Sequence, residues 1–227
     1  MHILKNILFI FLFMSIESHA QKNKDIIHTI INNYFTAIGG KERAQQVHTF
    51  ASESVGTLDE NQIVLTKKLM LPNLSTSSML IGNQVISKNT FDGKKGMVMQ
   101  HDDEVEFTSK ELRRHKKNRC IFPEFDYLHT AKYLGIEKIA QSNCYVLQIE
   151  NSKIYYSVNS GLKRKGISIQ EKDGKTFLQE LYFANYIEIE GLLFPTNLLM
   201  VVGDHKIEFQ TRSIVINRDV ATSDFKL

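Results

Sequence analysis

The sequence predicts an α+β fold in which a strongly curved antiparallel sheet, an incomplete β-barrel, carries helices over its concave face. Most of the chain consists of short segments in which apolar and polar residues alternate, as in strands with one covered face and one face in water. Tight-turn pairs such as Gly82-Asn83 and Asp92-Gly93 separate these segments, so neighbouring strands are expected to be antiparallel. Apolar residues at helical spacing occur near the N-terminus, and a basic segment interrupts the strands in mid-chain.

Residues 1–20 have the pattern of a secretory signal peptide. Lys5 supplies a positive start, an apolar run extends from Ile7 to Met14, and the small residues Ser18 and Ala20 stand at positions −3 and −1 of a cleavage site. The run is shorter than the roughly 20 residues that span a bilayer, which argues against the alternative of an anchor helix. We therefore expect cleavage after Ala20 and a single mature domain, residues 21–227, that is soluble in the periplasm.

The mature chain would be mildly basic and would carry no N-terminal lipid. Lys5 and Glu17 leave together, so the formal net charge stays at +3, and Gln21, not cysteine, follows the cleavage point. This charge argues neither for nor against nucleic acid, and we expect no nucleic-acid partner. The two cysteines, Cys120 and Cys144, could form a disulfide in an oxidising compartment. The alternative is two separate thiols, with Cys144 as a small core residue in a strand.

The clearest helix extends from Asp25 to Ile38, where apolar residues recur at helical spacing. Gly39-Gly40 follows as a C-cap. A phosphate-binding loop at Gly39-Gly40-Lys41 is not favoured, because the glycines follow a helix and the rest of that motif is missing.

Strands with a period of two are expected on both sides of the mid-chain segment. The first set is Thr49–Leu58, Gln62–Leu71, Leu74–Ile81, Gln84–Phe91 and Gly96–Gln100. The second set is Tyr145–Ile149, Ile154–Val158, Gly166–Glu171, a hairpin over Thr176–Asn197, Leu198–Val202 and His205–Ile216. Within the hairpin, Glu190-Gly191 forms the turn, and Pro195 is expected to end the pairing at an edge.

The mid-chain segment, Asp102 to Leu134, contains a polar helix that begins near Thr108 and the densest charge run of the chain. Arg113, Arg114, Lys116 and Lys117 are its candidate contact residues for anionic lipid headgroups or for an acidic envelope protein. The alternative is a solvated helix face without a partner. The aromatic residues that follow, from Phe122 to Tyr133, must pack over other parts of the chain to leave water.

Four segments carry a resemblance to a known family. The family consists of periplasmic proteins similar to the lipoprotein-sorting carriers LolA and LolB. Its characteristic hairpin resembles Tyr182 to Tyr186 followed by Glu190 to Pro195. Its opening segment resembles the stretch from Tyr34 through Gly39-Gly40-Lys41. Residues 154–166 and 214–227 are similar to later parts of the same family. The resemblance implies a half-barrel with the 109–134 segment lying against its concave side, and its motifs are turns and packing residues.

Catalytic and metal-binding motifs are not evident. Of eight histidines, those outside the leader are scattered without metal-ligand spacing, and His101-Asp102-Asp103-Glu104 is the nearest approach to a metal cluster. A nucleophile elbow of the Gly-x-Ser-x-Gly type does not occur. We expect no enzyme activity, no metal and no cofactor.

The fold that these features predict favours a soluble periplasmic carrier that binds an acyl chain of a lipid or lipoprotein in an apolar cavity. Candidate wall residues are those whose strand parity places them with the apolar face, with ordinary core packing as the alternative for each. They are Leu65, Leu69, Met79, Ile81, Met97, Met99, Tyr145, Leu147 and Ile149.

Two other functions stay open. One is a non-catalytic module that docks an envelope protein through the basic helix. The other is a hydrolase whose pocket brings a histidine, a carboxylate and a nucleophile together.

Overall fold

The computed structural model describes residues 23–58, 60–82, 84–101, 103–117, 121–172 and 175–227, without the side chains of 170–172 and 175. The expected signal peptide and its cleavage after Ala20 lie outside the described residues. So do Asn83, Asp102 and Cys120.

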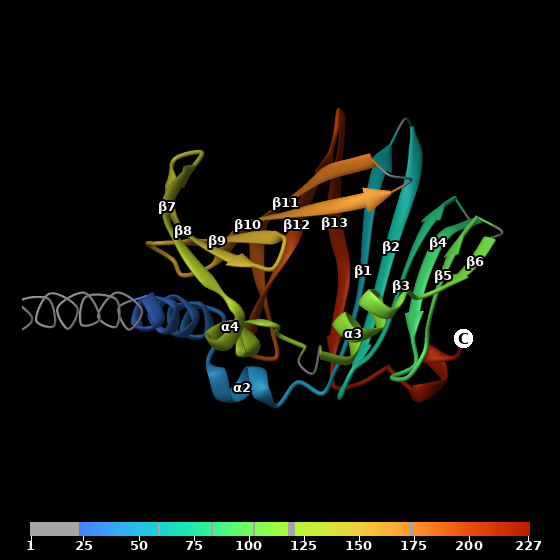
Figure 1. Cartoon of the computed structure of the whole chain (residues 1–227), viewed down its shortest axis with the longest axis horizontal. Helices are drawn as coiled ribbons and strands as arrows, with labels where there is room; N and C mark the ends of the chain where they lie inside the picture. The colour runs from blue at the N-terminus through green and yellow to red at the C-terminus, as the bar shows by residue number, and fades with distance from the viewer. Residues whose placement is uncertain (1–22, 59, 83, 102, 118–120, 173–174) are drawn as a thin grey trace, which may run out of the picture.

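The described residues form one thirteen-stranded antiparallel sheet with the order β6-β5-β4-β3-β2-β1-β13-β12-β11-β10-β9-β8-β7 (Figure 1). Its first half consists of β1 (Thr49–Leu58), β2 (Asn61–Met70), β3 (Leu74–Ile81), β4 (Gln84–Phe91), β5 (Gly96–Gln100) and β6 (Asp103–Glu106). Its second half consists of β7 (Lys132–Ile139), β8 (Ser142–Ile149), β9 (Ser152–Ser157), β10 (Lys163–Lys172), β11 (Lys175–Ile189), β12 (Leu192–Val202) and β13 (His205–Ile216).

The path of the chain through the sheet explains its shape. The chain starts at the centre with β1, moves outward to the edge strand β6, and reaches the other edge, β7, through the mid-chain helices. From β7 it returns strand by strand to β13, which pairs with β1. Because β6 and β7 do not pair, the sheet is curved but open, as the sequence predicts for an incomplete barrel.

The helices lie on one face and at one end of the sheet (Figure 1). They are a helix over residues 23–37, α2 (Lys41–Gln45), α3 (Ser109–Lys117) and α4 (Glu124–Thr130), and a 3-10 turn, η1 (Thr222–Phe225), lies near the C-terminus. The helix over 23–37 ends before Gly39 and Gly40, which both have positive φ angles, as the predicted C-cap requires.

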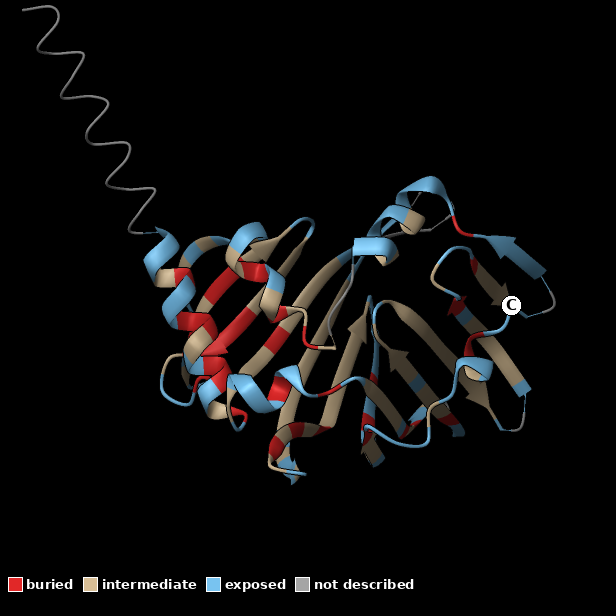
Figure 2. Cartoon of the chain, turned by 90° about the horizontal axis from the view of Figure 1, so that it is seen from below, coloured by how far each residue is buried: buried red, intermediate tan, exposed pale blue. Residues whose placement is uncertain are grey.

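Two of the three apolar clusters of the described core lie on the helix-bearing face, and the third contains Cys144, Val146 and Tyr155. The first joins the helix over 23–37, α4 and strands β8, β9, β12 and β13, with Phe35, Leu147 and Tyr156 among its buried members. The second has Ile63, Ile207 and Phe209 at its centre. Figure 2 shows buried residues gathered mainly at the end of the sheet that carries the N-terminal helix. The other end of the same face is therefore less covered.

Some details differ from the sequence-based expectations. Strand β6 was not expected, since its four residues, Asp103 to Glu106, are all exposed and show no apolar alternation. Pro195 does not end a strand, because β12 continues through it. The proline pairs with Tyr186 on β11, whereas the pairing of β12 with β13 begins only at Asn197, so the missing N–H of Pro195 faces no strand partner there.

Cys144 lies in β8 as a buried free thiol. This is the core role that the sequence allowed as the alternative to a disulfide.

Candidate functional site

The strand register defines an inner and an outer face of the sheet, because directly paired residues point to the same side. On the inner face, which carries α3 and α4, Ile63 pairs with Ile81 and Leu65 pairs with Met79. On the outer face, Lys68 binds Asp224 of η1 through an Nζ to Oδ1 contact of 2.6 Å. The two faces of β2 therefore alternate residue by residue.

Four of the predicted wall residues follow the inner face of β2 and β3. Leu65, Met79 and Ile81 surround the second apolar cluster and are only partly buried. Leu69 is also half-buried and lines a pocket beneath α3. These side chains form an apolar strip that is not fully covered by other parts of the described chain.

The wall residues predicted on β8 lie in the first cluster. Leu147 is fully buried, and Tyr145 and Ile149 are partly buried against the same cluster. Tyr145 pairs with Tyr156, whose ring contacts the Tyr34 ring of the N-terminal helix at a centroid distance of 5.3 Å. At Leu147 the structure thus matches the alternative of ordinary core packing.

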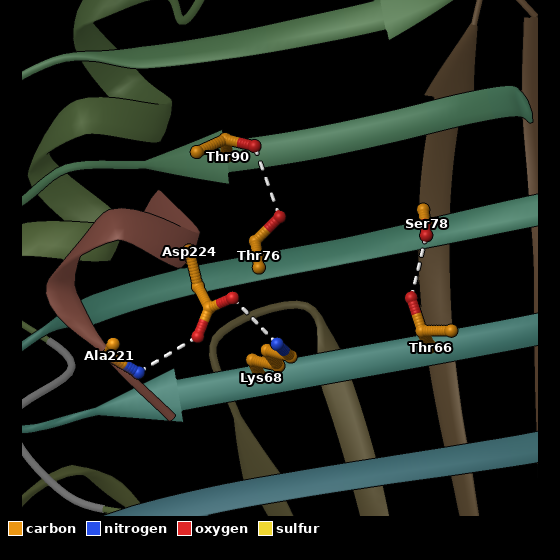
Figure 3. Close-up of polar contacts among 7 residues, drawn as sticks. All are labelled: Thr66, Lys68, Thr76, Ser78, Thr90, Ala221 and Asp224. Carbon is orange, nitrogen blue, oxygen red and sulfur yellow. Dashed lines mark hydrogen bonds and ion pairs between the residues drawn. The ribbon is translucent and has the colours of Figure 1, made fainter. Parts of the chain in front are cut away.

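Met97 and Met99 do not share the inner face, which corrects that part of the prediction. Met97 pairs with Thr90, and Thr90 pairs with Thr76 on the same side as Lys68. Figure 3 shows this outer side, where hydrogen bonds join Thr76 to Thr90 and Thr66 to Ser78. On β5, Val98 faces inward instead, because the turn from β4 sets a register that strand alternation alone does not reveal.

A pocket of about 260 Å³ lies between the inner face and α3. Its lining combines one cation with hydroxyl, amide and imidazole groups and a few apolar side chains. The inner-face and helix-side members are Lys67, Leu69, Ser75, Ser77, Asn89, His115, Ile121 and Pro123, and the turn between β2 and β3 completes it.

Lys67 is the residue that sequence reasoning missed. It stands between Leu65 and Leu69 on the inner face of β2, and the sequence signal is this charge at an apolar position of the alternation. Its side chain is exposed, yet desolvation by the surrounding protein lowers its pKa, and the positive charge of Lys163 lowers it further.

Lys163, in contrast, is neutralised within the core. Its Nζ lies 2.5 Å from Oε1 of the fully buried Glu124 at the start of α4. The same carboxylate oxygen accepts a hydrogen bond from the Tyr156 hydroxyl at 3.0 Å. The buried pair ties the mid-chain connector to β10.

Helix α3 separates this pocket from a wider one. Thr108 and Glu111 form its N-terminal capping box, since the Glu111 carboxylate accepts from the Thr108 backbone N–H at 2.7 Å and the Glu111 N–H donates to Thr108 Oγ1 at 3.3 Å. His115 packs toward the sheet, with its ring centroid 4.7 Å from that of Phe107 and 5.2 Å from that of Phe91.

The opposite side of α3 is basic. Arg113, Arg114 and Lys117 line a pocket of about 670 Å³ that extends to the turn between β8 and β9. Lys116 is exposed but does not line it. Three of the four predicted contact residues therefore face a common space.

The pocket beneath α3 also brings a serine and a histidine together. Ser75 Oγ lies 3.4 Å from His115 Nδ1, a long contact. The nearest carboxylate on the helix, Glu111, accepts hydrogen bonds from Thr108.

Among the described residues, no group of three histidine, cysteine or acidic side chains could hold a metal ion. Within the same residues, none of the helices combines the length and apolar character that crossing a bilayer requires.

Solved structures share this fold. A LolA superfamily protein from Nitrosomonas europaea has a TM-score of 0.55 at 12% identity, over 87% of this chain and 96% of that one. A DUF1329 family protein from Desulfovibrio piger has a TM-score of 0.53 at 10% identity, over 88% of this chain and 97% of that one. No family model matches the sequence, and no curated protein matches it either. At these identities the likeness establishes the fold, which is LolA-like.

Proposed function

From the LolA-like fold, we propose that this protein is a carrier of the bacterial envelope that binds the acyl chain of a lipid or lipoprotein on its inner face. The N-terminal sequence pattern supports export to the periplasm, with cleavage after Ala20. We propose a non-catalytic binding role, because the Ser75–His115 contact found in the described residues is long and the Glu111 carboxylate of the same helix is bound to Thr108.

The observation that carries this proposal is the incompletely covered apolar strip of the second cluster. Leu65, Met79 and Ile81, together with Leu198 and Met200 from β12, surround three buried residues but keep part of their own surface accessible. An acyl chain laid along this strip gains about 0.8 kcal/mol for each methylene removed from water. Met79 and Met200 are flexible enough to fit chains of different shape.

Native mass spectrometry tests the carrier role. The protein is expressed with its own N-terminal segment, purified from the periplasm without detergent, and any mass lost on denaturation is identified after organic extraction. We expect a stoichiometric lipid or a protein-linked acyl group. An empty protein that also fails to take up a fluorescent fatty acid would refute the carrier role.

The second candidate is a docking module that contacts an envelope protein through α3. It is favoured by the exposure of Arg113, Arg114, Lys116 and Lys117 on one short helix with no buried residue. Charge reversal at these four positions should abolish capture of an acidic partner and leave fatty-acid uptake intact. Loss of uptake in the same variant, with unchanged thermal unfolding, would assign the helix to the carrier role instead.

The hydrolase alternative has a simple test of its own. Ser75→Ala removes the only hydroxyl that contacts His115 in the described structure. Ester hydrolysis by the wild-type protein that disappears in this variant would establish catalysis and contradict the non-catalytic role.

A further inference from the structure

Lys67 has no carboxylate partner among the described residues, in contrast to three other lysines of the sheet. Lys68 binds Asp224, Lys163 binds Glu124, and Lys165 binds Glu180 at 2.8 Å. In the described structure no ion pair and no hydrogen bond reaches Lys67 Nζ. The pocket that it lines contains no acidic side chain. An ammonium group that lines a pocket without a carboxylate partner can bind the oxygen atoms of an anionic ligand.

The residues around Lys67 include several that can donate hydrogen bonds to an anion. Ser77 lies directly opposite Lys67 on β3, and Asn89 lies directly opposite Ser77 on β4. Ser75 and His115 line the same pocket from the sheet and from α3. Hydroxyl, amide and imidazole N–H groups can each donate to an anionic oxygen, and a lysine ammonium adds up to three donors. The pocket thus offers one positive charge within a ring of neutral donors.

The apolar strip begins immediately beside this polar pocket. Leu65 is the next inward-facing residue along β2, and Ile63 is the one after it. At a rise of about 3.3 Å per residue, the four steps from Lys67 to Ile63 cover about 13 Å. A ligand with one charged end and one aliphatic chain can therefore occupy both parts at once, with its chain lying over β2 and β3 on the inner face.

We infer that the ligand is a single-chain amphiphile whose anionic head group, a carboxylate or a phosphate, binds Lys67 with Ser77 and Asn89, while its chain follows the partly buried Leu65, Met79 and Ile81. This inference rests on the proposed carrier function and specifies the ligand class. It gives the protein a preference for charged amphiphiles over neutral ones of equal length.

Displacement of a fluorescent fatty acid from delipidated protein tests the inference with three matched ligands: palmitate, hexadecyl phosphate and uncharged hexadecanol. In wild type, at least one of the two anions should bind about tenfold or more tightly than hexadecanol, because a charge-assisted hydrogen bond exceeds a neutral one by that factor. Comparison of palmitate with hexadecyl phosphate identifies the head group.

Variants at neighbouring positions locate the effect. Lys67→Met should remove the preference for the anion and leave hexadecanol binding unchanged, whereas Lys67→Arg should retain most of it. Lys68→Met is the matched control, since Lys68 lies on the outer face and is already paired with Asp224. It should change none of the three affinities.

The outcomes separate the two proposals. If hexadecanol binds wild type as tightly as both anions, the inferred head-group site is wrong and the carrier function still holds. If none of the three ligands nor the fluorescent probe binds, the carrier function itself fails. If Lys67→Met keeps the full anion preference, the anion is bound elsewhere and the inference is overturned. The wild-type comparison decides the first two cases without any variant.

Discussion

Gly39 lies directly against Gly191, and the contact leaves no room for a side chain on Gly39. A Cβ built there would lie 2.0 Å from the Gly191 carbonyl oxygen. The Ile38 carbonyl accepts a hydrogen bond from the Leu193 N–H at 2.8 Å. Arg43 Nη1 donates to the carbonyl oxygens of both Gly39 and Gly191, at 2.9 Å each. These hydrogen bonds and the close backbone contact hold the end of the N-terminal helix against the turn between β11 and β12.

Replacement of Gly39 by alanine should therefore destabilise the protein strongly. The new Cβ would clash with backbone, and the φ angle of +116° is one that side chains rarely adopt. We expect Gly39→Ala to lower the free energy of unfolding by more than about 2 kcal/mol in urea titrations. Gly203→Ala is the matched control, with positive φ but open space, and should cost only about 1 kcal/mol. Equal losses in both variants would mean that the helix end can move away from the turn.

The buried pair of Glu124 and Lys163 makes a second stability prediction. Glu124→Gln leaves the Lys163 ammonium without its anion next to the Tyr34 ring, 5.4 Å from the ring centroid. Breaking such a pair should lower the free energy of unfolding by about 3–5 kcal/mol. The double variant Glu124→Gln with Lys163→Met should lose less than the single variant, because no charge is left unpaired. A double variant as unstable as the sum of its parts would show that the two residues act independently.

Much of the fold could be predicted because local signals agree with it. The bounds of β1, β3, β4 and β5 coincide with the predicted strands, since turn residues such as Asp92-Gly93 mark their ends. Asp92 fixes its turn by accepting hydrogen bonds from the Lys94 and Lys95 N–H groups at 2.8 and 2.6 Å. Strand β6 escaped prediction because it is held by pairing with β5 and not by an apolar face.

The site was only partly predictable because it depends on register. Alternation within β5 shows that Met97 and Met99 share a face, but only the pairing with β4 shows which face that is. Lys67 was overlooked for a different reason. Strand alternation alone places polar residues in water, whereas Lys67 interrupts the apolar row of β2 at the inner face.

Methionines on opposite faces give a matched test of the apolar strip. Met79 borders the second cluster on the inner face, and Met99 lies on the outer face. Met79→Gln should weaken fatty-acid binding about tenfold, since it places an amide where the chain would lie and removes apolar contact area. Met99→Gln should leave the affinity unchanged. Affinities measured by fluorescence displacement that fall equally for both variants would place the ligand elsewhere.

The lowered pKa of Lys67 predicts that its positive charge lowers the stability of the ligand-free protein. A lysine whose pKa is lower in the folded state than in the unfolded chain binds fewer protons when folded, so its contribution to stability rises with pH between those two pKa values. Below that window desolvation and the positive charge of Lys163 disfavour the charged side chain, and solvent screening keeps this effect small because the side chain is exposed. Lys67→Met should therefore unfold at a higher temperature than wild type at pH 7.

The same linkage fixes how this difference changes with pH. As pH rises toward 10.5, the ordinary pKa of lysine, wild-type Lys67 loses its proton and the advantage of Lys67→Met should shrink. Thermal unfolding of both proteins at pH 7, 8.5 and 10 measures the trend, and other titrating groups cancel in the difference. Addition of palmitate at pH 7 should stabilise wild type more than Lys67→Met, since the anion neutralises the charge that otherwise opposes folding. A difference that grows with pH, or that palmitate does not alter, would show that Lys67 is not the uncompensated cation of the inner face.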